Sequence, residues 1–231
     1  MRKPPASAFT LIEMLTVLAI IVILTGLVVA VSGYVQKKAS LARAGGKIAL
    51  LISACESYKS DNGSHPRDTG NKSVTDAINP MVDFIPTDKK YTESSLFLYK
   101  ELSGDKTGSS GAPDGIPDDD QPRYLKDVET RILKATRNPT TKAIISVQCM
   151  QDPFGFPYAY STSAAKVEQT YQTKILQNPA LRSTEARKVG TEAQGFNVGS
   201  YDLWSTGGSN AKSTPAADKM NLEWAKWIKN W

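Results

Sequence analysis

The chain carries one histidine, His65, which lies beside Pro66 among turn-forming residues. General acid-base catalysis needs a titratable side chain within hydrogen-bonding reach of the reacting group. The sequence has no recognisable Ser, His and acid arrangement, no metal-spaced cysteines and no phosphate-binding loop. We therefore predict that the chain is not an enzyme and that His65 is a surface turn residue.

Two cysteines, Cys55 and Cys149, allow two interpretations. In an oxidising compartment an even count permits a disulfide, which would contribute on the order of 4 kcal/mol in the chain-entropy model. Alternatively, both are separate buried thiols, because cysteine is among the most buried residue types. Sequence does not supply the geometry of a disulfide, so both interpretations stay open.

A Gly-rich acidic stretch, SGDKTGSSGAPDGIPDDDQP at 103–122, has almost no apolar residues and is predicted to be a solvated loop. Calcium takes six to eight oxygen ligands at about 2.3–2.6 Å, and clustered carboxylates supply them. The spacing is not that of an EF-hand, so the loop is either a calcium site or an unliganded acidic loop. Its aspartates are Asp105, Asp114, Asp118, Asp119 and Asp120.

Glu13 is the only charged residue in a long apolar run, FTLIEMLTVLAIIVILTGLVVAV, from Phe9 to Val31. About 20 apolar residues at a rise of 1.5 Å span a hydrocarbon core of about 30 Å, so the run predicts a transmembrane segment. A charge inside such a segment costs about 2.5–3.5 kcal/mol unless it finds a partner. The position of Glu13 therefore requires a functional explanation.

Helical periodicity continues beyond the apolar run. The apolar positions that carry it are Leu41, Ile48, Leu51, Ile52 and Cys55. We predict one helix over 9–60, with its transmembrane part at 9–31 and a bend at the paired glycines 45–46. Turn residues at 61–63 and then Pro66 end it.

The remaining residues, 61–231, have the size of one globular domain. We expect an α+β fold in which the long helix packs on a small antiparallel sheet. The predicted elements are helices at 94–102 and 124–137, strands at 143–149, 157–162 and 196–204, and a polar surface excursion at 166–194. Apolar residues recur at helical spacing in 220–231 and form a stripe on one face of a predicted helix. They are Trp224, Trp227, Ile228 and Trp231. We predict that this stripe packs on its own domain rather than on a partner.

The block AFTLIEML, from Ala8 to Leu15, resembles the class III leader of type IV pilins and type II secretion pseudopilins, with Ala8 where glycine is usual. The resemblance implies that residues 1–8 are a leader, that prepilin peptidase cuts between Ala8 and Phe9, and that the new amine is methylated. It also implies that Glu13 of one subunit meets the Phe9 amine of the next in a helical filament. A secretory signal peptide and an uncleaved membrane anchor are the alternatives.

Two carboxy-terminal blocks resemble the major pseudopilin of type II secretion. DPFGFPYAY at 152–160 is similar to its DPWGNPY block, and YDLWSTGG at 201–208 is similar to its FDLxSxGxDG block. The loop after the second block binds calcium in that family. The resemblance therefore implies calcium ligands at Leu203 through its carbonyl, at Ser205 and at Asp218, with Ser209 where an aspartate is expected.

These resemblances imply a pilin-like pseudopilin subunit that spans the bacterial inner membrane once, with its carboxy-terminal domain in the periplasm. The implied partners are further copies of the chain, prepilin peptidase, an assembly platform with its ATPase, and minor pseudopilins. The 28 basic and 23 acidic residues give a net charge of only +5, so we expect no nucleic-acid partner. The alternatives are a type IV pilin and, of another class, a membrane-tethered binding module or enzyme with its site in the unplaced region 67–140.

Overall fold

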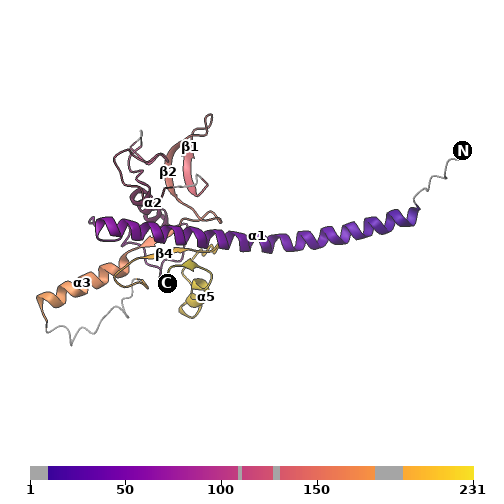
Figure 1. Cartoon of the computed structure of the whole chain (residues 1–231). Helices are drawn as coiled ribbons and strands as arrows, with labels where there is room; N and C mark the ends of the chain where they lie inside the picture. The colour runs from indigo at the N-terminus through magenta and orange to yellow at the C-terminus, as the bar shows by residue number, and fades with distance from the viewer. Residues whose placement is uncertain (1–9, 109–110, 127–130, 180–194) are drawn as a thin grey trace. The chain divides into compact units, whose positions relative to one another are not determined.

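The structure is a computed structural model that describes residues 10–108, 111–126, 131–179 and 195–231. The chain divides into two compact units, 1–40 and 41–231, and each is described by itself. The first helix, α1 (Leu11–Asn62), contributes its beginning to the first unit and its remainder to the second. Figure 1 shows the elements along the chain.

Within the first unit, every described residue from 10 to 38 is exposed. Among residues 10–40, no side chain covers the apolar side chains of the transmembrane candidate. Among the described residues, α1 is one helix that is long and apolar enough to cross a membrane. The predicted membrane-length helix is thus confirmed, and α1 fits membrane anchoring.

The second part of α1 buries one face in the globular unit. The buried residues recur at helical spacing and are Ala44, Ile48, Leu51, Ala54 and Cys55. The helix continues without interruption through Gly45 and Gly46 and ends at Asn62. Gly63 follows with φ 76°, and its amide donates to the carbonyl of Lys59 at 2.8 Å. A left-handed glycine of this kind is a common helix stop, and it lies where the turn residues predicted the end.

Helix α2 (Lys89–Ser103) packs against a two-stranded antiparallel sheet of β1 (Leu133–Arg137) and β2 (Ile144–Met150). The predictions of a helix at 94–102 and a strand at 143–149 are confirmed. The helix predicted at 124–137 is wrong, because 124–126 are not helical and 133–137 pair with β2 from Leu133↔Met150 to Arg137↔Ile144. Residues 127–130 of that prediction lie outside the described residues.

A three-stranded antiparallel sheet has the order β3–β4–β5, with β3 (Ala159–Ser161), β4 (Asp202–Ser205) and β5 (Ile228–Lys229). The strand predicted at 157–162 is confirmed. The one predicted at 196–204 begins only at Asp202, because the carboxylate of Asp202 binds the backbone of the preceding loop. Together the two sheets and the long helix form the expected α+β fold.

Helix α3 (Ser163–Gln177) occupies the first part of the polar surface excursion predicted at 166–194, and residues 180–194 of that prediction lie outside the described residues. The carboxy-terminal helix is only α5 (Met220–Trp224), preceded by the 3₁₀ turn η2 (Ala217–Lys219). The helical stripe predicted for 220–231 is therefore wrong, because the chain leaves the helix after Trp224 and adds β5 to the sheet.

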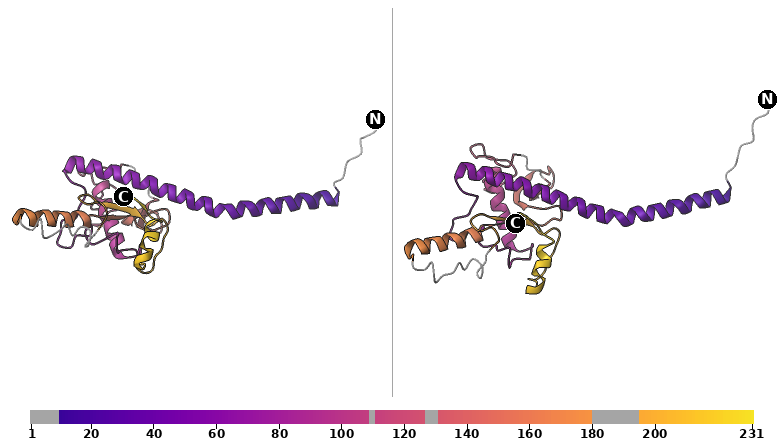
Figure 2. Two further views of the ribbon diagram at one scale, coloured as in Figure 1. Left: turned by 90° about the horizontal axis from the view of Figure 1, so that it is seen from below. Right: turned by 60° about the horizontal axis from the view of Figure 1, so that its bottom comes forward.

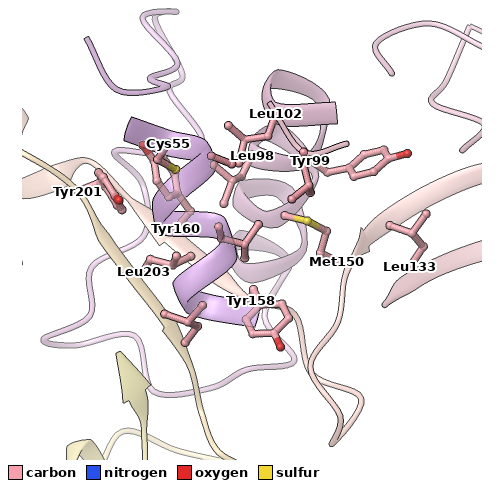
Figure 3. Close-up of a cluster of buried hydrophobic side chains, with 14 of the residues drawn as sticks. Cys55, Leu98, Tyr99, Leu102, Leu133, Met150, Tyr158, Tyr160, Tyr201 and Leu203 are labelled. Carbon is pink, nitrogen blue, oxygen red and sulfur yellow. The ribbon is translucent and has the colours of Figure 1, made fainter. Parts of the chain in front are cut away.

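Two clusters of buried side chains form the core of the globular unit. The larger cluster joins α1 and α2 to both sheets, and Figure 3 shows Leu98, Met150, Tyr158 and Leu203 within it. The smaller cluster is largely aromatic and is built from Ile78, Phe84, Tyr91, Ala159, Trp204 and Trp227. In Figure 2 the second part of α1 runs along one side of this unit in both views.

Candidate functional site

The amino-terminal candidate site is described from Thr10 onward, so the predicted cleavage residues Ala8 and Phe9 lie outside the described residues. Glu13 Oε2 accepts hydrogen bonds from the backbone amide and from the hydroxyl of Thr10, both at 2.8 Å. In return, the amide of Glu13 donates to Thr10 Oγ1 at 3.3 Å. This reciprocal pair is a capping box, which satisfies amide groups at the start of a helix.

The capping role of Glu13 is one that sequence reasoning missed. Its signal is present as Thr-x-x-Glu at Thr10–Glu13, directly before the apolar run. Both hydrogen bonds from Thr10 end on Oε2, and Glu13 has no ion pair among the residues from Thr10 onward that the structure describes. One carboxylate can thus cap its own helix and still present its second oxygen, Oε1, to a cation from elsewhere.

The two carboxy-terminal blocks, far apart in sequence, lie side by side. Strands β3 and β4 pair with Ala159 opposite Trp204 and Tyr160 opposite Leu203. The hydroxyl of Ser205 donates to Asp152 Oδ2 at 2.6 Å, which joins the beginning of the first block to the end of the second. The two blocks, which are separated along the chain, thus contact each other directly in the fold.

Asp152 also builds the turn that carries the first block. Its Oδ1 accepts the amides of Phe154 at 2.9 Å and Phe156 at 3.0 Å, while Gly155 takes φ 88°. Residues 152–156 therefore form a tight turn. Burial raises the pKa of the Asp152 carboxyl above its ordinary value, against the opposing effect of the Ser205 hydroxyl and the turn amides.

The three predicted calcium ligands do not form a donor set. The Leu203 carbonyl accepts the amide of Asn230 at 3.1 Å, and the Ser205 hydroxyl donates to Asp152. Asp218 is exposed in η2, and the structure shows no hydrogen bond or ion pair between it and the other two within the described ranges. Calcium needs six to eight oxygens that converge on one point, so this set does not fit the ion.

The acidic loop binds its own backbone with its carboxylates. Asp105, which is fully buried, accepts the Tyr99 hydroxyl at 2.6 Å and the Gly115 amide at 2.7 Å. Asp118 Oδ2 accepts the amides of Lys106 and Thr107, each at 3.1 Å. No group of three His, Cys, Asp or Glu side chains that could hold a metal ion occurs among the described residues, which exclude 109–110 of this loop.

Both cysteines are free thiols and both are buried, which is the second of the two interpretations. Cys55 belongs to the larger core cluster, where Figure 3 shows it beside Tyr160 and Tyr201. Cys149 lies on β2, opposite Lys134 of β1. Burial raises the pKa of the Cys55 thiol far above its ordinary value and that of Cys149 to about 11, so neither is a reactive thiolate.

A polar cavity of about 960 Å³ is lined by the end of α1, the segment 63–76 and the start of α3. Several of its charged groups pair with neighbouring side chains. His65 Nε2 lies 2.9 Å from Glu56 Oε1, and the guanidinium of Arg67 binds Gln169 Oε1 at 2.7 Å and Asp76 Oδ2 at 3.3 Å. The Thr162 hydroxyl, also in the lining, donates to Asp76 Oδ1 at 2.8 Å.

The carboxy-terminal tryptophans pack on their own domain, as predicted. Trp227 stacks on Trp204 with ring centroids 5.6 Å apart, and Trp231 stacks on Phe196 at 4.5 Å. The indole of Trp224 donates to the carbonyl of Pro80 at 2.9 Å. The tryptophans of this tail therefore pack in or against the aromatic cluster of their own domain.

Comparison with protein families gives one match, the prokaryotic N-terminal methylation motif, at residues 4–29. No curated protein and no solved structure matches the chain. The match covers the predicted cleavage residues, Glu13 and most of the apolar run of α1. The chain thus carries at its amino terminus the methylation motif typical of type IV pilins and pseudopilins, the pilin-like proteins that prepilin peptidase processes.

Proposed function

We propose that the chain is a pseudopilin of the major type, a subunit of a periplasmic filament that serves type II protein secretion. Prepilin peptidase removes residues 1–8 and methylates the amine of Phe9. The beginning of α1 anchors the subunit in the inner membrane, and the unit 41–231 lies in the periplasm. Filament growth pushes folded substrates through an outer-membrane channel, driven by an assembly ATPase on a membrane platform and helped by minor pseudopilins.

The observation that carries this proposal is the methylation motif at 4–29, which overlaps an apolar run, 9–31, whose only charged residue is Glu13. A carboxylate at this depth is costly unless a cation meets it. The Phe9 amine of an adjacent copy is such a cation. Because the capping box engages only Oε2, pairing with that amine and capping by Thr10 are compatible.

A type IV pilin for adhesion, motility or DNA uptake is the second candidate, because it has the same amino-terminal motif. The contact between the two carboxy-terminal blocks favours the pseudopilin. Asp152 and Ser205, which begin the first block and end the β4 part of the second, are hydrogen-bonded to each other and buried. A deletion strain should therefore lose secretion of folded proteins while it keeps surface pili, and the opposite phenotype would select the pilin.

The assembly mechanism is tested by separating the charge of Glu13 from its capping role. Glu13→Gln keeps an oxygen that accepts from Thr10 but removes the negative charge, so we expect at least tenfold fewer crosslinked multimers in membranes. Thr10→Ala removes the capping hydroxyl and keeps the charge, so it should assemble as the wild type does. Equal loss in both variants would assign Glu13 to helix capping alone.

Mass spectrometry of the mature chain supports this comparison. The expected amino terminus is a methylated Phe9 in the wild type and in both variants, which shows that differences in assembly are not differences in processing. A purified protein from the native host that still begins at Met1 would refute the proposal.

A further inference from the structure

The loop that follows β4, residues 206–209, lies directly against the segment 223–226. Gly207 takes φ 61°, and a Cβ at this position would overlap the carbonyl oxygen of Lys226. The amide of Gly207 donates to Ser205 Oγ at 3.1 Å, and that of Ser209 donates to the Thr206 carbonyl at 3.0 Å. The loop is thus a closed turn held at a fixed distance from the carboxy-terminal segment.

Side chains join the same two segments. The hydroxyl of Ser209 donates to Glu223 Oε2 at 2.7 Å, and the ammonium of Lys226 donates to Glu223 Oε1 at 2.5 Å. The side chain of Glu223 is 20 % exposed and that of Lys226 is 53 % exposed. The hydrogen bond from Lys226 and then that from Ser209 lower the pKa of Glu223, so the carboxylate is charged at neutral pH.

This arrangement differs in charge from a divalent-cation site. A calcium loop gathers several uncompensated carboxylate, hydroxyl and carbonyl oxygens around one ion. Here one of the two carboxylates at the loop, that of Glu223, is already paired with an ammonium, and the hydroxyls of Ser205 and Ser209 both donate to carboxylates.

We infer that three linked side chains hold the loop after β4 in its folded conformation and replace a bound divalent cation there. They are the Lys226 ammonium, the Glu223 carboxylate and the Ser209 hydroxyl. Lys226 is thus the cation of this loop, carried by the protein itself. The inference does not depend on the proposed function, because it concerns only the order of one loop. Its consequence is that this end of the domain stays folded at any calcium concentration.

The first test asks whether the loop responds to calcium. The full chain in detergent micelles is held in about 5 mM EDTA or about 5 mM CaCl₂, and amide hydrogen exchange of Gly207 and Ser209 is measured together with the Tm. We expect the same exchange rates and the same Tm in both. Calcium-dependent slowing of these amides, or a Tm several degrees higher with calcium, would overturn the inference, because a ligand that binds the folded state stabilises it.

The second test asks whether Lys226 supplies the ordering charge. Lys226→Met keeps the aliphatic stem and removes the charge, and it should speed exchange at Gly207 and Ser209 about two- to fivefold, as expected for a half-exposed ion pair. Lys226→Arg should restore slow exchange, and Lys219→Met, a charge removed from the exposed η2 turn, should have no effect. Unchanged exchange in Lys226→Met, or equal acceleration in Lys219→Met, would refute the role of Lys226.

Discussion

Among the described aspartates of the globular unit, three are almost completely buried, and all three serve as acceptors for the protein's own donors. Asp105 is 0 %, Asp152 3 % and Asp202 1 % exposed. A buried carboxylate is costly unless hydrogen bonds replace the lost water. Asp202 accepts the amides of Phe196 at 2.8 Å and Asn197 at 2.9 Å, just as Asp152 accepts those of its turn. These aspartates therefore organise loops, and their place in the motifs is explained by folding.

The Ser205 hydroxyl is the donor whose removal should reveal this role. Ser205→Ala leaves Asp152 buried with one donor fewer, which costs about 1–3 kcal/mol. At about 2–4 °C per kcal/mol for a chain of this size, we expect a Tm lower by roughly 2–12 °C. Ser94→Ala is the matched control, because Ser94 is also fully buried but bonds only to backbone groups.

The loss in Ser205→Ala should also depend on pH. Burial raises the folded-state pKa of Asp152 above its unfolded value, so the stability contribution of this group falls as the pH rises through the interval between the two. The Ser205 hydroxyl lowers the folded-state pKa of Asp152. Without this hydroxyl that pKa is higher, so the interval between the unfolded-state and folded-state pKa values extends to higher pH. The destabilisation should therefore be larger at about pH 7 than at about pH 4, the ordinary range of an aspartate. Equal losses at both pH values, or a similar pH dependence in Ser94→Ala, would contradict this account.

At the scale of elements, the sequence predicted those parts whose patterns are long or whose turn residues are specific. The continuous apolar run and the helical spacing up to Cys55 predicted α1, and the turn residues at 61–63 predicted where it ends. Strand β1 was missed because its five residues carry no clear alternation and become a strand only by pairing with β2. Glu223 was missed because a contact across 14 residues with Ser209 leaves no local pattern.

The carboxy-terminal segment was assigned to the wrong element for a related reason. Tryptophans at helical spacing in 220–231 suggested one helix, whereas Trp227 is needed beside Trp204 in the aromatic core. Adding β5 to β4 meets this need and pairs Trp204 with Lys229. Tertiary packing thus outweighed local periodicity over the last residues.

Gly207 and Gly155 provide a matched pair for testing how tightly the loop after β4 meets the carboxy-terminal segment. Both have positive φ, at 61° and 88°, so an alanine costs about 1–2 kcal/mol of backbone strain at either position. Only at Gly207 does the added Cβ meet backbone, the carbonyl of Lys226, while Gly155 faces open space. In urea unfolding we expect Gly207→Ala to lose about 3 kcal/mol or more and Gly155→Ala about 1. Equal losses would show that the two segments are not in contact in solution.

At the scale of the whole molecule, the division at residue 40 separates the apolar first part of α1 from the unit that contains the buried core. Both buried clusters and all described strands lie within 41–231, whereas the described residues from 10 to 38 are exposed throughout. The described apolar side chains of the first unit are therefore not part of either buried cluster. A membrane or neighbouring copies must cover its side chains, because an apolar surface of this length is not stable in water.

We accordingly expect residues 41–231 to fold on their own as a soluble monomer. Their Tm should lie within about 2 °C of the domain transition of the full chain in detergent, while membrane association and multimers are lost. Leu51→Ala, made in the same fragment, tests whether the retained part of α1 belongs to the core. Leu51 is 1 % exposed, so its truncation should cost about 2–5 kcal/mol, whereas Leu50→Ala, at a position 41 % exposed, should cost less than about 1 kcal/mol. A fragment that aggregates, or that melts about 10 °C below the full chain, would show that the first forty residues are needed for the domain to fold.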